Sequence, residues 1–390
     1  MFCTAIAGFG RWQAQGGVAR GLAATAVGLW VALAGWAAPA QAQGAAASAA
    51  AESHWVRLPT LYGRITAREL GLVINTADPY SVAVGEYYAR RRGIPVANIL
   101  RVELPLRPSL SREEFAALDE AVRSRLPDTV QGLALAWVQP YAVECNALTS
   151  ALAMGLQPGL CAQSCAATRP SPYMSYSGSR PWSVIGLRPA MQLAARSVAS
   201  AQALIERGIA ADGQLAERPA EPARAYLAST PDAARNVRER LFPPAGPVPG
   251  VAALEVVRVR SEALPPLRRT LVYETGLARP APMAGEWLPG ALADHLTSFG
   301  GQLEHGPGDG QMNVLDWLES GATASYGTVS EPCNHVQKFP HPQVLIRSYA
   351  QGLSALEAYW RSVAWPAQGV FVGEPLAAPF AAPPASASTP

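Results

Sequence analysis

Short apolar runs alternate with helical patterns along residues 70–138. The runs 70–76 (LGLVINT), 98–104 (NILRVEL) and 131–138 (QGLALAWV) have the length and apolar content of buried strands. A helical pattern over 81–92 stops at Gly93, and Ser111 with Glu114 forms a capping box that begins a second helix. This β-α-β-α-β alternation predicts an α/β fold with a largely parallel sheet and helices on both faces.

The pattern continues after a loop-rich interval. Residues 140–189 are rich in Pro, Gly, Ser, Tyr and Cys, and this length indicates a functional segment or an insertion rather than a plain connection. Beyond it we expect further helices at 191–207, 232–241, 313–320 and 354–363. Further strands are expected at 223–230, 253–259, 269–275, 322–329 and 369–375. Residues 61–380 are therefore predicted to form a single α/β domain with a Cys-containing insertion at about 140–189.

The two ends of the chain have a different composition. Two arginines precede the apolar run 21–34, and Ala40-Gln41-Ala42 has the small-x-small form of a signal-peptidase site, so residues 1–42 are interpreted as a cleaved signal peptide. The alternative is a retained membrane anchor. Because no later run has about 20 apolar residues, we expect no membrane association after cleavage, and a periplasmic or secreted protein. Residues 43–60 and 381–390 are predicted to be a disordered linker and tail.

Export changes how charge and cysteine content are interpreted. Loss of Arg11 and Arg20 with the signal leaves 29 basic and 29 acidic residues, which gives no support for nucleic-acid binding. Disulfides are the default for the remaining cysteines in an oxidising compartment. Three pairings are open for these four disulfide candidates: Cys145, Cys161, Cys165 and Cys333.

Polar residues follow several predicted strands, where ligands of parallel sheets bind. The alternative is that half or more of them only cap helices and turns. We expect Glu331 to point into a crevice at this edge, on a turn set by Pro332. The binding candidates are Asp78, Asp294, Thr297, Thr328 and Glu331.

Motifs for cofactors are missing from the sequence. No G-x-G-x-x-G or Walker-type loop follows the first strand, so no nucleotide cofactor is expected. Cys161-x-x-x-Cys165 and the pair His335 and His341 match no strong zinc spacing, so no metal is expected either.

A nucleophile can be assembled from two glycine-flanked segments. In 293–301 (ADHLTSFGG), His295 lies beside Ser298, and Cys333 follows in 321–335 (GATASYGTVSEPCNH). A histidine base with a cysteine or serine nucleophile requires only that the groups be close in space. The alternative is a buried, hydrogen-bonded His295 and a Cys333 that belongs to a disulfide.

Several of these segments also resemble known families. Residues 73–95 (VINTADPYSVAVGEYYARRRGIP) and 316–327 (DWLESGATASYG) are similar to a family of exported bacterial proteins with no assigned activity, over roughly residues 65–380. A more distant resemblance is to the gingipain-type cysteine peptidases, which have a caspase-like fold. In that comparison 316–327 resembles the helix and Gly-Ala strand of those peptidases, and Gly373-Glu374-Pro375 resembles their closing segment.

The peptidase resemblance implies a scaffold without its catalytic pair. The nucleophile strand would be 293–301, yet Thr297, Ser298 and Phe299 stand at its tip in place of cysteine. Thr275-Gly276 is the nearest match to the upstream His-Gly motif. Two hypotheses follow: a non-catalytic scaffold that binds a peptide or glycan at the carboxyl edge of the sheet, or a peptidase-like hydrolase that uses His295 with Cys333 or Ser298.

Overall fold

The computed structural model describes residues 55–217, 219–280, 285–304 and 312–382. The predicted signal peptide, residues 43–54 of the predicted linker and residues 383–390 of the predicted tail lie outside this part. Within it, residues 55–60 have no helix or strand, but the Val56 amide donates to Gln343 Oε1 at 2.7 Å. No helix in these ranges is long and apolar enough to cross a membrane.

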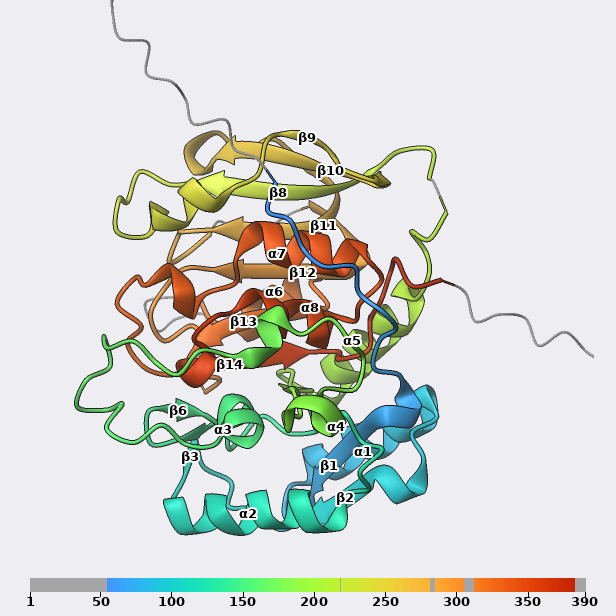
Figure 1. Cartoon of the computed structure of the whole chain (residues 1–390), viewed down its shortest axis with the longest axis vertical. Coiled ribbons are helices and arrows are strands. Elements are labelled where there is room, and N and C mark those ends of the chain that lie inside the picture. Colours follow the sequence, from blue (N-terminus) through green and yellow to red (C-terminus); the bar gives the residue numbers. More distant parts are fainter. Residues whose placement is uncertain (1–54, 218, 281–284, 305–311, 383–390) are drawn as a thin grey trace, which may run out of the picture. The chain divides into compact units, whose positions relative to one another are not determined.

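One sheet of 11 described strands runs through the molecule (Figure 1). Its order is β2 (Ile99–Val102), β1 (Leu70–Asn75), β4 (Gly132–Leu135), β7 (Ala190–Gln192), β14 (Gly369–Gly373), β13 (Ala324–Thr328), β12 (Gly285–His295), β11 (Leu267–Thr275), β8 (Ala223–Ser229), β10 (Val251–Arg260) and β9 (Gly246–Val248). A small second sheet holds β3 (Ser109–Leu110), β5 (Ala142–Val143) and β6 (Asn146–Ala147). The predicted α/β fold with a largely parallel sheet is confirmed.

Strand direction divides the sheet into two blocks. β2, β1, β4, β7 and β14 are parallel to one another, and so are β13, β12, β11, β8 and β10. The blocks meet at the antiparallel pair of β13 and β14. The carboxyl ends of the first block therefore lie at the opposite edge from those of the second.

The helices cover both faces, as expected. They are α1 (Pro79–Arg92), α2 (Arg112–Arg125), α3 (Leu148–Met154), α4 (Pro181–Ile185), α5 (Val198–Ala211), α6 (Val314–Ser320), α7 (Pro342–Ala350) and α8 (Ala355–Ser362), and the 3-10 helices include η4 (Asn236–Leu241) and η6 (Val336–Lys338). In β1, Leu72 clusters with Val84 of α1, whereas Val73 clusters with Phe115 of α2. Alternate side chains of one strand thus pack on opposite helix layers.

Local signals explain several boundaries. The Ser111–Glu114 capping box begins α2, and Gly93, in the left-handed conformation with φ 65°, ends α1. Gly321 caps α6 with its amide directed at the Leu318 and Trp317 carbonyls. These three elements match their predicted positions.

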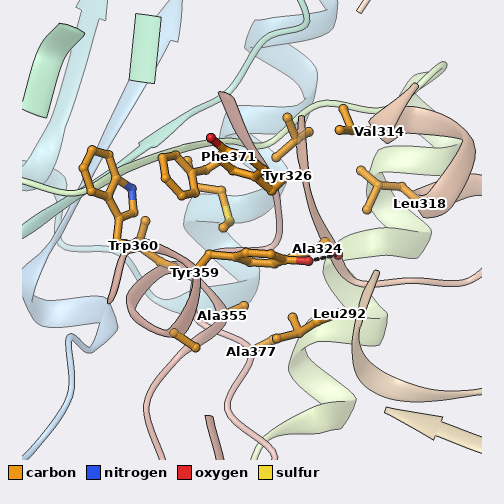
Figure 2. Close-up of a cluster of buried hydrophobic side chains, with 14 of the residues drawn as sticks. Leu292, Val314, Leu318, Ala324, Tyr326, Ala355, Tyr359, Trp360, Phe371 and Ala377 are labelled. Carbon is orange, nitrogen blue, oxygen red and sulfur yellow. Dashed lines mark hydrogen bonds between the residues drawn. The ribbon is translucent and has the colours of Figure 1, made fainter. Parts of the chain in front are cut away.

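The middle of the sheet is closed by aromatic packing from α8. Trp360 stacks on Phe371 of β14 with ring centroids 4.5 Å apart, and Tyr359 reaches across β12 and β13 (Figure 2). The Tyr359 hydroxyl donates to the carbonyls of Ala293 and Ala324, at 3.3 and 3.4 Å. This packing fixes the positions of β12 and β13 relative to each other, and these two strands lead into the site described below.

Three predictions of local structure were wrong. Residues 190–192 form strand β7 and the helix begins only at Val198, because Ser197 is its N-cap. Residues 232–241 contain the 3-10 element η4 instead of an α-helix. Strand β12 runs from Gly285, well before the segment that the peptidase resemblance indicated, and helix α7 was not predicted.

Candidate functional site

Two turns at the carboxyl edge of the second block enclose a cavity of about 280 Å³. One turn follows β12 and the other follows β13. The lining residues are Ala234, Arg235, Leu296, Thr297, Ser298, Glu331, Pro332, Cys333, Asn334 and Phe339. We call this the edge cavity.

Glycines allow the two turns to touch. The Gly301 amide donates to the Thr328 carbonyl at 2.9 Å. A Cβ atom at Gly327 would lie 2.5 Å from the Gly300 carbonyl carbon, and one at Gly301 would lie 2.7 Å from the Gly327 oxygen. No larger residue fits at Gly301 or Gly327 without moving the backbone. The small residues at the end of β13 therefore allow the two turns to approach each other closely.

Glu331 lines the edge cavity from the turn after β13. Its Oε1 accepts the Cys333 amide at 2.7 Å, and Gln368 Nε2 donates to its backbone carbonyl at 2.7 Å. The side chain is half-buried, next to Pro332. Arg235 brings the opposite charge to the lining, with Nη1 bonded to Asp232 Oδ2 at 2.8 Å.

His295 is placed away from this cavity as a buried structural group. Its Nδ1 accepts the Trp317 indole N–H at 2.8 Å. Because that nitrogen is the acceptor, Nε2 carries the proton and donates to the Met312 carbonyl at 3.0 Å. Burial lowers the pKa of His295 to about 4, so the ring is neutral and both of its nitrogens are engaged.

Cys333 is bonded to Cys165, and Cys145 is bonded to Cys161. Of the three possible pairings, the one formed links Cys165 of the insertion to the turn after β13 and closes a loop within the insertion between Cys145 and Cys161. The candidate role of Cys333 as a thiol nucleophile is corrected here, because its sulfur is in a disulfide. Its role as a wall of the edge cavity remains.

Asp294 lies beneath the site without reaching it. Its fully buried carboxylate contacts Arg238 Nη1 at 2.5 Å, and Arg238 Nη2 donates to the Thr275 carbonyl at 3.1 Å. Glu274, its in-register neighbour on β11, is 3.6 Å from the same Nη1. Asp294 is therefore part of a buried ion cluster, and the proposal that it binds a ligand is corrected.

Two further binding candidates lie elsewhere. Asp78 follows β1 of the first block, at the opposite edge, where its Oδ1 accepts the Tyr80 amide and caps α1. Asp78 therefore does not share a crevice with Glu331, because the antiparallel pairing of β13 with β14 reverses the strand direction between the two blocks. Thr328 is at the correct edge and fully buried, but it is not among the residues that line the cavity.

The lining includes five residues that the sequence singled out: Thr297, Ser298, Glu331, Pro332 and Cys333. The other lining residues were not singled out. Arg235 directly precedes η4 and Phe339 directly follows η6. Neither segment carries a sequence motif. Only the folded chain brings these segments to the strand ends. Within the described ranges, no cluster of three or more His, Cys, Asp or Glu side chains is placed to hold a metal ion.

No protein-family model and no curated protein matches this chain. Among solved structures, the chain is similar to the Arg-specific cysteine proteinase gingipain R, with a TM-score of 0.43 and 8% sequence identity. The match covers 81% of this chain and 80% of that one, and a likeness this distant assigns no activity.

Proposed function

We propose that this protein is a non-catalytic scaffold that binds a short peptide segment in the edge cavity. The observation that carries the proposal is the composition of that cavity, where Arg235 and Glu331 bring opposite charges to the hydroxyl-bearing residues Thr297 and Ser298. Concave sites with a few convergent polar groups are typical of ligand binding.

Backbone conformation supports a functional role for the same two turns. Phe299, Cys333 and Asn334 have φ values of 60°, 57° and 45°. Left-handed conformations cost energy for residues other than glycine, and they cluster at ligand sites. Phe299 is also 39% exposed, an apolar ring directly after Ser298.

A peptide is favoured over a glycan by the lining. Phe339 is the one aromatic residue among the described lining residues, and it is 1% exposed. Phe339 therefore offers no ring face on which a sugar could stack, and the exposed ring of Phe299 lies outside the lining. A carboxylate and a guanidinium instead suit the charged and amide groups of a peptide.

Binding is favoured over hydrolysis because the proposed base and thiol are engaged. His295 has both ring nitrogens in hydrogen bonds, and Cys333 is in a disulfide. A hydroxyl such as that of Ser298 needs an adjacent base to become a nucleophile. The engagement of His295 and Cys333 in other bonds supports binding over hydrolysis.

The test is a titration of fluorescent synthetic peptides that carry one Lys, Glu or Gln in an alanine background. We expect Glu331→Gln, which keeps the acceptor for the Cys333 amide but removes the charge, to weaken binding of the Lys peptide about fivefold or more. Glu120→Gln, on the exposed surface of α2, is the matched control. The proposal fails if no peptide binds, or if the two variants behave alike.

A further inference from the structure

A second cavity lies at the same edge of the sheet. It has a volume of about 170 Å³ and is lined by Leu227, Ser229, Glu239, Phe242, Arg258, Val259 and Arg260. β8 and β10, which supply five of these residues, run in the same direction as β12. We call it the arginine cavity.

The element η4 connects the two cavities. Arg235, one residue before η4, lines the edge cavity, whereas Glu239 within η4 and Phe242 directly after it line the arginine cavity. Between them, the fully buried Arg238 fastens η4 to Asp294 and to the Thr275 carbonyl. The two cavities therefore share one anchored wall.

Two guanidinium groups that line the arginine cavity have N–H donors available to bind a ligand. Arg258 Nη2 is 3.6 Å from Glu239 Oε1, and Arg260 Nη2 is 3.6 Å from Glu262 Oε1. Both separations exceed hydrogen-bond range, and exposed pairs of this kind are weak. Because the two arginines are two positions apart on β10, their side chains lie on the same face of the sheet.

A carboxylate is the ligand that this arrangement fits. Guanidinium groups bind carboxylates through paired, charge-assisted hydrogen bonds. The buried ring of Phe242 lies 5.8 Å from the Arg258 guanidinium carbon and supports that side chain from one side. The lining contains two arginines against one glutamate, so its charge favours an anion.

We infer that the arginine cavity is a second subsite that holds a carboxylate of the same peptide bound in the edge cavity. This inference rests on the proposed function. The carboxylate is supplied either by an acidic side chain or by the peptide's C-terminus, and the ligand crosses η4 to reach both cavities.

The test uses fluorescent alanine-based peptides of roughly six residues, which span about 20 Å when extended. Each carries one Lys, plus either Glu or Gln at a second position, and each ends in a free carboxylate or an amide. We expect the double variant Arg258→Gln/Arg260→Gln to weaken binding of the carboxylate-bearing peptides about tenfold, and to leave the Gln-amide peptide unchanged. Arg240→Gln is the matched control, because Arg240 is an exposed η4 residue that lines neither cavity.

The outcomes separate this inference from the function on which it rests. Loss confined to the Glu peptides assigns the subsite to an acidic side chain, and loss confined to free C-termini assigns it to the chain end. If Glu331→Gln weakens binding while the double variant matches Arg240→Gln, the second subsite is wrong and the proposed function stands. If no peptide binds the wild-type protein, both are wrong.

Discussion

Three ionisable side chains are buried together at this sheet edge, and their acidic and basic groups are unequal in number. Glu274, Asp294 and Arg238 are all fully buried, so two carboxyl groups share one guanidinium. Both Glu274 oxygens lack a hydrogen-bond partner, whereas Asp294 Oδ1 bonds Arg238. Burial away from any donor therefore raises the pKa of Glu274 well above its usual range, and we assign the proton of the pair to Glu274.

Substitutions at these two carboxyls should have opposite effects. A raised folded pKa means that the folded state holds a proton which the unfolded state releases, so Glu274 costs stability as pH rises above its unfolded value. Glu274→Gln should raise the free energy of unfolding at pH 8 by about 1 kcal/mol. Asp294→Asn should lower it by about 3 kcal/mol, because Arg238 loses its bonded counter-charge. Urea unfolding of both variants checks this, and equal signs would contradict the assignment.

His295 should make the protein sensitive to mild acid. Its folded pKa of about 4 lies below the unfolded value of about 6.5, so the unfolded state gains the proton first. The free energy of unfolding should therefore fall as pH drops from 6.5 to 4, by on the order of 3 kcal/mol. His295→Gln should flatten this part of the curve. Nitrogen-detected NMR that finds His295 titrating near pH 6.5 would refute the buried, neutral assignment.

At the scale of elements, short buried contacts determine how helices meet the sheet. Glu374 directly follows β14 and accepts Arg92 Nη2 of α1 at 2.6 Å and the Tyr88 hydroxyl at 2.7 Å. Gly208 of α5 makes room for it, because an added Cβ would lie 2.4 Å from Glu374 Oε2. The closing segment is thus bonded to one helix and packed on another.

Gly208→Ala should destabilise the protein, although replacing a glycine within a helix usually stabilises it. Helix propensity alone would stabilise the variant by about 1 kcal/mol. We expect a net loss of about 2 kcal/mol instead, because the new methyl group displaces a buried, ion-paired carboxylate. Thermal unfolding gives the sign directly, and a higher midpoint than wild type would show that Glu374 can move aside.

The two disulfides should differ in their effect on binding. Cys165–Cys333 supports a wall of the edge cavity, whereas Cys145–Cys161 closes a loop within the insertion. Replacing either pair by serines should lower the free energy of unfolding by about 2–4 kcal/mol. Only the Cys165→Ser/Cys333→Ser variant should weaken peptide binding, measured at a temperature where both variants are folded. Equal affinities in the two variants would exclude Cys333 from the site.

For the whole molecule, sequence patterns predicted the elements far better than their arrangement. The buried strand at 70–76 and the capped helix that begins at Ser111 carry local signals, because apolar runs and capping boxes are patterns of neighbouring residues. The antiparallel pairing of β13 with β14 has no local sequence signal, so Asp78 was grouped with Glu331 as a binding candidate although the two residues lie at opposite edges of the sheet. The three-residue strand β7 is likewise too short to show a period. Arg235 entered the site only through the position of η4.

In the proposed function, the edge cavity binds a peptide and leaves it intact. The most direct test incubates the wild-type protein with the pooled synthetic peptides, separates bound from free by gel filtration, and reads both fractions by mass spectrometry. We predict that full-length peptides co-elute with the protein, that Glu331→Gln releases those carrying Lys, and that no fragments accumulate. Cleavage fragments that are lost on substitution of Ser298 or His295 would contradict the account and establish a hydrolase.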